Sequence, residues 1–287
     1  MEKHVLNFHN EGATLCGQIF FPGGTPPYPL VILSHGLSGI ATMDLPFYVE
    51  TFLKRGLGCF IYDHRNWGQS SGWPRCETDP WRQVSDMREA ISVVRVQKEV
   101  DREKIGLWGT SYSGGHVITV GALDKRVACV VSQVPLISGS KTFDNWVPEE
   151  KRVKFIDRLT SDFDGRSKGG EPQSTKAAIE GSETYEWVIN SNIAGDYRNE
   201  ITLKTFDLMR TYEPIQFVNR VAPTPIALVI ADSDTQTPTD WQLEAFDQMG
   251  GDKRLYRFNC RHYDVYMSYK QKAADAAADW FVEHLEV

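Results

Sequence analysis

Residues 105–115 read Ile-Gly-Leu-Trp-Gly-Thr-Ser-Tyr-Ser-Gly-Gly, and an apolar run continues to residue 120. The pattern predicts a short apolar strand, a sharp turn and the start of an apolar helix. Ser111 stands at the turn, and small residues at 109 and 113–115 allow the strand and the helix to approach closely. A turn of this kind holds a hydroxyl clear of its own backbone, so Ser111 is the candidate nucleophile.

Strand-like and helical segments alternate on both sides of this turn. A continuous apolar run at residues 30–33 predicts a strand buried on both faces, and residues 58–62 predict a second buried strand. Further strands are predicted at residues 127–134, 225–230 and 254–258. Apolar residues at helical spacing predict helices at residues 44–55, 80–97, 112–123, 239–249 and 267–285. The alternation indicates a mainly parallel sheet covered by helices on both faces.

The pattern changes between residues 136 and 216, where strand-like runs stop and charged residues, aromatic residues and loops increase. We interpret 136–216 as a mostly helical insertion into a core formed by residues 1–135 and 217–287. Most of its aromatic residues should pack it against the core, and a few should line an apolar pocket above Ser111. Trp146 is the first candidate for this pocket, and Trp67 and the ring of Tyr112 are further candidates.

A serine hydroxyl needs a base to become nucleophilic near pH 7. In a parallel sheet, residues that share a site lie at the carboxyl ends of strands. Asp234 follows strand 225–230, and His262 follows strand 254–258. We predict that His262 takes the proton of Ser111 and that Asp234 orients the imidazole ring. Asp232 and Asp264 are alternative acids, expected to be a structural residue and a solvated loop carboxylate respectively.

Two backbone N–H groups should form an oxyanion hole. One belongs to Tyr112, which follows the nucleophile at a helix N-terminus whose dipole favours negative charge. The other is expected from Leu37, in the loop after strand 30–33. His35 should shape that loop rather than carry protons.

Other polar residues near these segments are expected to have structural roles. His116 lies in the helix after the nucleophile and is predicted to pack in the core. His64 is predicted at the surface. Asp63 and Arg65 are predicted to hold their loop together as an ion pair.

The order Ser111, Asp234, His262 along the chain resembles that of the α/β-hydrolase superfamily. The resemblance covers residue 28 to the end, apart from the 136–216 insertion, which falls where members carry a lid or cap. Residues 109–113 depart from the G-x-S-x-G pattern at the last position, where serine is still small. Residues 231–238 resemble the acid turn, and residues 62–70 resemble the D-x-R-x-x-G-x-S loop. The resemblance implies an eight-stranded, mainly parallel, doubly wound sheet with a helical cap.

Within this superfamily, the chain is most similar to the dienelactone-hydrolase-like and peptidase-like branch. It also resembles fungal hydrolases and acyltransferases that act on polyketide chains. These resemblances imply a serine hydrolase that cleaves an ester, thioester or lactone of a small, largely apolar acyl substrate. Acyl transfer to an alcohol or amine, amide cleavage and a catalytically silent ligand-binding protein are the alternatives.

Composition limits the classes of partner. The net charge is −7 with both signs mixed along the chain, which argues against nucleic acid. Hydrophobic residues make up 41% of the chain, but no apolar run is long enough to span a membrane. We therefore expect no membrane partner. Five scattered cysteines without a CxxC pair predict free thiols and a cytoplasmic location. No metal or cofactor motif is present, and the expected partner is a small-molecule acyl substrate. The sequence is also compatible with a homodimer.

Overall fold

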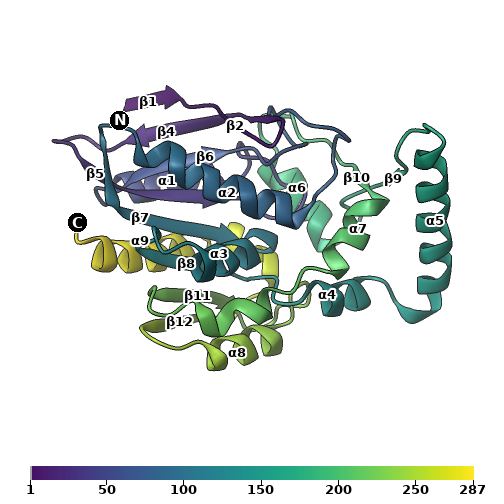
Figure 1. The fold of residues 1–287 in the computed structure, drawn as a ribbon. Coiled ribbons are helices and arrows are strands. Elements are labelled where there is room, and N and C mark those ends of the chain that lie inside the picture. The colour runs from purple at the N-terminus through teal and green to yellow at the C-terminus, as the bar shows by residue number, and fades with distance from the viewer. Residues whose placement is uncertain (1) are drawn as a thin grey trace.

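The computed structural model describes residues 2–287 and contains an eight-stranded sheet in the order β1-β4-β6-β5-β7-β8-β11-β12 (Figure 1). The pairs β1–β4 and β4–β6 are antiparallel, and the other neighbours are parallel. The mainly parallel sheet predicted from the sequence is therefore confirmed. The strands of this sheet are β1 (Glu2–Val5), β4 (Gly17–Phe21), β5 (Tyr28–Ser34), β6 (Gly58–Tyr62), β7 (Val100–Thr110), β8 (Cys129–Gln133), β11 (Ile226–Ala231) and β12 (Lys253–Phe258).

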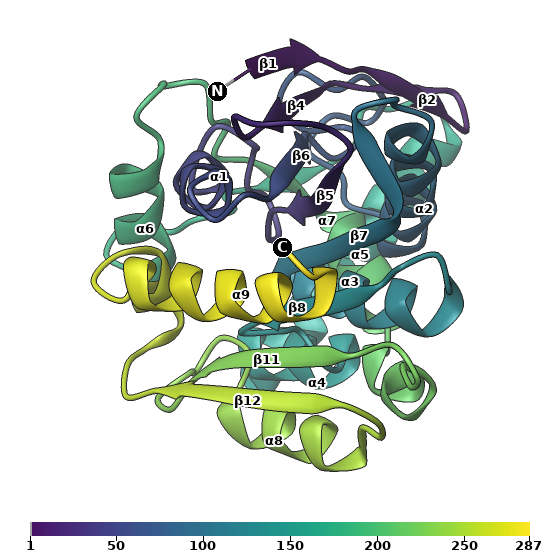
Figure 2. The same cartoon turned by 90° about the vertical axis from the view of Figure 1, so that its left-hand side faces the viewer.

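Helices cover both faces of this sheet. Figure 2 shows α1 and α9 on one side of the strands and α2 and α3 on the other. Successive residues of β7 divide between the two sides, since Leu107 packs in the core beneath α2 and α3 and Trp108 in the core beneath α1 and α9. The helices of the core are α1 (Leu45–Leu53), α2 (Pro80–Arg95), α3 (Tyr112–Leu123), α8 (Thr239–Gln248) and α9 (Lys270–Leu285).

Helix α2 illustrates how the local sequence fixes an element. The Asp79 carboxylate accepts hydrogen bonds from two N–H groups of the first turn, and Pro80 occupies the first helical position. Val84, Met87, Ile91 and Val94 recur at helical spacing and are all buried. Burial of each such side chain contributes about 1.5–3 kcal/mol to stability.

Residues 136–216 form a helical segment beyond the carboxyl ends of the parallel strands, with α5 outermost (Figure 1). Its helices are α4 (Gly139–Trp146), α5 (Glu149–Ser167), α6 (Glu183–Ser191) and α7 (Leu203–Arg210). A two-residue strand pair, β9 (Ser174–Thr175) and β10 (Ile201–Thr202), is a small exception to the predicted lack of strands. The 3₁₀ helix η1 (Pro214–Arg220) leads back to β11.

The remaining elements are short. Strands β2 (Phe8–Asn10) and β3 (Ala13–Leu15) form an antiparallel pair, and the 3₁₀ helix η2 (His262–Tyr266) follows β12. Among residues 2–287, every helix falls short of the combined length and apolarity that a bilayer span needs.

Candidate active site

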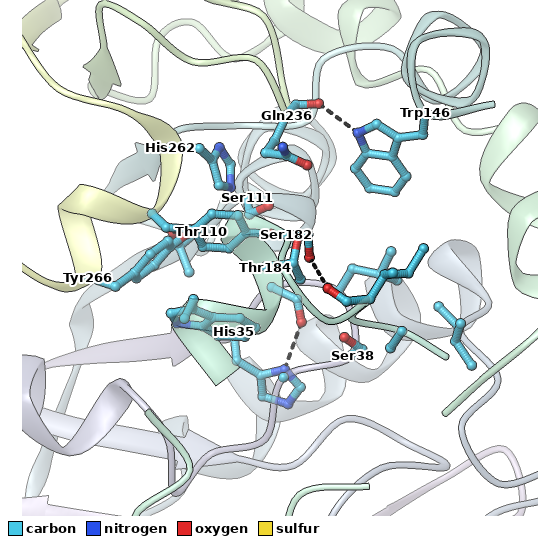
Figure 3. A pocket seen from close by; sticks show the side chains of 18 of the residues that line it. His35, Ser38, Thr110, Ser111, Trp146, Ser182, Thr184, Gln236, His262 and Tyr266 are labelled. Atoms are coloured by element: carbon cyan, nitrogen blue, oxygen red, sulfur yellow. Dashed lines mark hydrogen bonds between the residues drawn. The ribbon is translucent and has the colours of Figure 1, made fainter. Parts of the chain in front are cut away.

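Ser111 occupies a strained turn between β7 and α3. Its backbone has φ 54° and ψ −116°, a conformation that residues other than glycine rarely adopt. The Ser111 N–H donates to the Gln133 carbonyl at 2.8 Å, and the Ser111 carbonyl accepts from Gly114 and Leu136 at 2.9 and 2.8 Å. These bonds hold the backbone in place and leave the hydroxyl facing the pocket (Figure 3).

Glycine is required where α3 packs against the strands. A Cβ on Gly109 would collide with the carbonyl oxygen of Ser113, and a Cβ on Gly114 would lie 2.7 Å from the Cα of Pro135. Any larger residue at either position would push the helix away from the sheet. The small residues predicted to permit the close approach are therefore at positions where the backbone needs them.

His262 and Asp234 form a buried hydrogen-bonded pair. His262 Nδ1 lies 2.8 Å from Asp234 Oδ2, and the exposed fractions of the two residues are 1% and 5%. Asp234 Oδ1 accepts from the backbone N–H groups of Gln236 and Thr237, both at 2.9 Å. Asp234 Oδ2 also accepts from Thr237 Oγ1 and Gln242 Nε2, each at 3.0 Å. The carboxylate is fully supplied with donors and is fixed against the imidazole ring.

The surroundings keep Asp234 ionised. Burial by itself raises the pKa of the Asp234 carboxyl, but the charge of His262 and hydrogen bonds from His262 and Thr237 outweigh that effect. The net pKa of Asp234 therefore lies below its ordinary value. An ionised carboxylate at Nδ1 selects the ring tautomer whose Nε2 can accept a proton.

The other two candidate acids contact arginines instead of His262. Asp232 lies 2.9 Å from Arg257 at the surface, and Asp264 accepts from the backbone N–H of Arg261 at 2.8 Å. Asp234 is the acid that the fold brings to His262. Ser111 and His262 both line the pocket, although within residues 2–287 no hydrogen bond joins their side chains. Such contacts are often long in a free enzyme and shorten when substrate binds.

The loop after β5 passes directly beside Ser111. A Cβ on Gly36 would lie 3.2 Å from the Ser111 Cβ, and both Gly36 and Leu37 line the pocket. In the described chain, the backbone N–H groups of Leu37 and Tyr112 donate to no other protein group. Both are therefore available to an anionic oxygen next to Ser111.

A cavity of about 570 Å³ lies above Ser111, between the core and the 136–216 segment. Trp146, predicted in this pocket, lines it and donates its indole N–H to the Gln236 carbonyl at 3.0 Å (Figure 3). The wall is mainly apolar, and its large side chains include Ile40, Met43, Leu45, Phe155, Trp187, Phe206, Tyr263 and Tyr266.

Two residues predicted to line the pocket lie elsewhere. Trp67 is 2% exposed, bonds to Thr78 Oγ1 at 3.0 Å and packs in the core beneath α1 and α9, because its loop folds back on itself. The ring of Tyr112 packs against His116 and Tyr212, with ring centroids 5.2 and 6.1 Å apart. Ser111 and Tyr112 are adjacent across the sharp turn, so their side chains point in different directions.

His116 lies in the core, as predicted. Its two ring nitrogens lie 2.9 Å from the Tyr212 hydroxyl and 2.9 Å from Gln83 Oε1. Burial lowers the pKa of His116 to about 3, so the ring is neutral at physiological pH.

Two predictions for residues 63–65 were wrong. His64 is not at the surface but 2% exposed, with Nε2 between Ser34 Oγ and Ser113 Oγ. Arg65 pairs with Asp86 of α2, Nε to Oδ2 at 2.6 Å, rather than with Asp63. The Asp63 carboxylate instead accepts backbone N–H groups, at 2.7 and 2.8 Å. Proximity in sequence favoured a local pair, but the strand end directs the neighbouring side chains to different partners.

The sequence did not reveal the role of Asp44 in the pocket. Its carboxylate accepts from Trp187 Nε1 at 2.7 Å and from Ser191 Oγ at 3.0 Å, both on α6. An aspartate before Leu45 and a proline signals only a helix start. Nothing in the sequence indicates a partner 143 positions away.

This geometry agrees with comparisons to known proteins. A family model described as the alpha/beta hydrolase fold matches residues 29–235. The chain belongs to the α/β-hydrolase family. The thiohydrolase aneE of Aspergillus aculeatus is 30% identical, with 88% of this chain and 83% of that protein covered. The polyketide transferase claH of Penicillium crustosum is 29% identical, covering 85% and 84%. The crystal structure of the α/β-hydrolase GrgF from Penicillium sp. sh18 has a TM-score of 0.88, with 24% identity over the full length of both chains.

The family match, together with similarity to proteins named as hydrolases, identifies this chain as an enzyme of the hydrolase class. It also accounts for the placement of the 136–216 segment over the carboxyl ends of the strands, where ligands bind in open α/β sheets.

Proposed function

We propose that the chain is a serine hydrolase that cleaves an ester or thioester of a largely apolar acyl group through an acyl-enzyme on Ser111. The observation that carries the proposal is the buried 2.8 Å pair of His262 and Asp234 beside a strained serine at the same pocket. This is the arrangement by which a serine hydroxyl becomes a nucleophile near neutral pH.

In the acylation step, His262 Nε2 accepts the Ser111 proton as Oγ attacks the acyl carbonyl carbon. The resulting oxyanion accepts hydrogen bonds from the backbone N–H groups of Tyr112 and Leu37. Asp234 stabilises the imidazolium form of His262. Collapse of the tetrahedral intermediate breaks the bond to the leaving alcohol or thiol, which takes the proton from His262. Each oxyanion donor contributes about 3 kcal/mol to the barrier reduction.

In the second step, water enters and His262 removes one of its protons. The water oxygen attacks the acyl-enzyme carbonyl carbon, and the second tetrahedral intermediate accepts hydrogen bonds from the same two N–H groups. When this intermediate collapses, the carboxylic acid leaves and Ser111 regains a proton from His262. The ester–water stoichiometry is one to one, and no cofactor takes part in either step.

The pocket supports an apolar acyl group. Aromatic side chains from both the core and the cap, such as Tyr266 and Phe155 respectively, form its wall, and their burial favours apolar carbon over water. Thioesters are included because the relative from Aspergillus aculeatus is named a thiohydrolase. Lactones are cyclic esters, so attack of Ser111 on their carbonyl carbon would follow the same chemistry and open the ring.

The direct test is Ser111→Ala with two substrates, a p-nitrophenyl octanoate ester and an octanoyl thioester assayed by thiol release. The variant should fold like the wild type by circular dichroism and lose turnover of both substrates. A fluorophosphonate probe should label the wild type and not the variant. Undiminished turnover in Ser111→Ala refutes the proposal, and failure of the probe to label the wild type supports the silent ligand-binding alternative.

Acyl transfer is the second candidate. The 136–216 segment forms part of the pocket wall, and a relative is named a polyketide transferase. A site that excludes water favours transfer to another acceptor. An alcohol or amine acceptor would then replace water in the second step. Product analysis with and without such acceptors separates the two reactions, because a transferase yields the new ester or amide and a hydrolase yields only the free acid.

A further inference from the structure

Ser113 stands where the G-x-S-x-G pattern of α/β-hydrolases has its second glycine. It lies in the first turn of α3, two residues after Ser111, and is fully buried. Its hydroxyl donates to the carbonyl oxygen of His35 at 2.6 Å. The residue that departs from the pattern therefore bonds to the loop that follows β5.

Ser113 is part of a closed group of buried polar side chains. The Ser34 hydroxyl donates to Ser113 Oγ at 3.1 Å, and His64 Nε2 lies 3.0 Å from both hydroxyl oxygens. The Ser34 hydroxyl proton is used in the bond to Ser113, and the Ser113 hydroxyl proton in the bond to the His35 carbonyl. His64 Nε2 therefore carries a proton and donates to the two hydroxyl oxygens. Burial, and repulsion from His35 and His116, lower the pKa of His64, so the ring is neutral with one N–H. In this arrangement of hydrogen bonds, the Ser113 hydroxyl donates to the His35 carbonyl.

The two peptide units on either side of Gly36 are held separately. Ser113 binds the carbonyl of the first unit, at His35. The carbonyl of the second unit, at Gly36, lies 3.0 Å from His35 Nδ1 and accepts from the Gly39 N–H at 3.2 Å. The N–H of Leu37 belongs to this second unit. Glycine has access to a wider range of backbone dihedral angles than other residues. Hydrogen bonds to both peptide units flanking Gly36 are therefore needed for the Leu37 N–H to keep one direction.

We propose that Ser113 is a positioning residue for the oxyanion hole, because its hydroxyl holds the His35–Gly36 peptide and with it the direction of the Leu37 N–H. The inference rests on the proposed function, in which Leu37 donates to the oxyanion on substrate attached to Ser111. Ser113 itself touches neither substrate nor the reacting atoms.

Loss of this hydroxyl should affect the transition state more than the ground state. A rotated or mobile Leu37 N–H forms a poorer hydrogen bond to the oxyanion, whereas the uncharged carbonyl of bound substrate uses that bond much less. The expected result is therefore a lower kcat with little change in KM.

The experiment compares Ser113→Ala and Ser113→Cys with Ser132→Ala. Ser132 is a matched control, since it is also fully buried and donates to a backbone carbonyl, that of Gly114, at 2.9 Å. Cysteine leaves no cavity and has only a weak S–H donor, so Ser113→Cys tests the idea even where the alanine variant loses packing. The readouts are kcat and KM for p-nitrophenyl octanoate and inhibition by an octyl trifluoromethyl ketone, which forms an oxyanion on Ser111.

Both Ser113 variants should lose roughly tenfold in kcat and in trifluoromethyl ketone affinity, with KM unchanged. Ser132→Ala should keep both values even if its melting temperature falls as much. Wild-type kcat and inhibitor affinity in a folded Ser113 variant overturn the inference, as does an equal loss in Ser132→Ala. Failure of the proposed function is seen separately, because Ser111→Ala would then remain active.

Discussion

Trp187 of α6 donates its indole N–H to the carboxylate of Asp44, which precedes α1, at a distance of 2.7 Å. The same ring stacks on Tyr263, with centroids 5.5 Å apart, and Tyr263 is the residue after His262. Thr184 of α6 also lies 2.8 Å from the Tyr263 hydroxyl. Helix α6 of the cap therefore joins the start of α1 to the segment that carries His262.

Replacing Trp187 with phenylalanine should loosen α6, because phenylalanine retains an aromatic ring against Tyr263 but cannot donate to Asp44. A hydrogen bond to a charged group is worth about 1.5–3 kcal/mol, so amide hydrogen exchange in α6 should rise more than tenfold. Trp73→Phe is the control, since Trp73 is 66% exposed. Unchanged exchange in α6 would show that the Asp44 bond does not hold the helix.

The effect of Trp187→Phe should depend on pH. Burial raises the pKa of Asp44 to about 6, so its carboxyl is ionised at pH 8 and largely protonated at pH 5. A neutral carboxyl is a weaker acceptor than a carboxylate. The difference in α6 exchange between wild type and variant, corrected for the intrinsic exchange rate, should therefore be larger at pH 8 than at pH 5. An equal difference at both pH values would contradict this.

Replacing Asp234 with asparagine should lower kcat by about 10⁴-fold, because the amide would favour the wrong tautomer of His262. Asp232→Asn is the matched control: it is two residues away, at the surface against Arg257, and should keep kcat. Steady-state hydrolysis of p-nitrophenyl octanoate measures both. The assignment of the acid fails if the loss occurs in Asp232→Asn instead.

His116 should make the fold sensitive to acid. Its pKa is about 3 in the folded protein and about 6.5 when unfolded, so between these values the unfolded chain binds more protons. Stability then falls as pH drops below 6.5, by about 1.4 kcal/mol per pH unit for this one group. Urea unfolding of wild type and His116→Gln from pH 7.5 to 4.5 should show a shallower decline in the variant. The exposed His4, replaced by glutamine, is the control, and parallel pH profiles for wild type and His116→Gln would exclude the effect.

The buried pair of Arg65 and Asp86 should matter far more than a surface pair. Their side chains are 2% and 0% exposed, so Asp86→Asn leaves a buried guanidinium without a counter-charge. The expected loss in the free energy of unfolding is about 3–5 kcal/mol. Asp279→Asn, which breaks the exposed pair with Arg55, should cost less than about 1 kcal/mol. Similar losses in the two variants, measured by urea unfolding, would contradict this reading.

The sequence predicted the elements that repeat a simple pattern. The buried strands stand out as short continuous apolar runs, and the stripe on α2 has a helical period, so a single chain reveals both. Ser111, Asp234 and His262 follow three strands whose ends must share one edge of the sheet. Trp67 was expected in the pocket and His64 at the surface, but both are buried because their loop folds back, which periodicity does not encode.

The sequence alone therefore determined the mainly parallel sheet, the turn at Ser111 and the order of the residues expected to act with it, because these depend on local spacing and on strand ends. The tertiary structure decided the partners of Asp44, Arg65 and Ser113, and hence which loops are held beside the pocket. These contacts join residues far apart in the chain, and their geometry is set only when the core and the cap pack together.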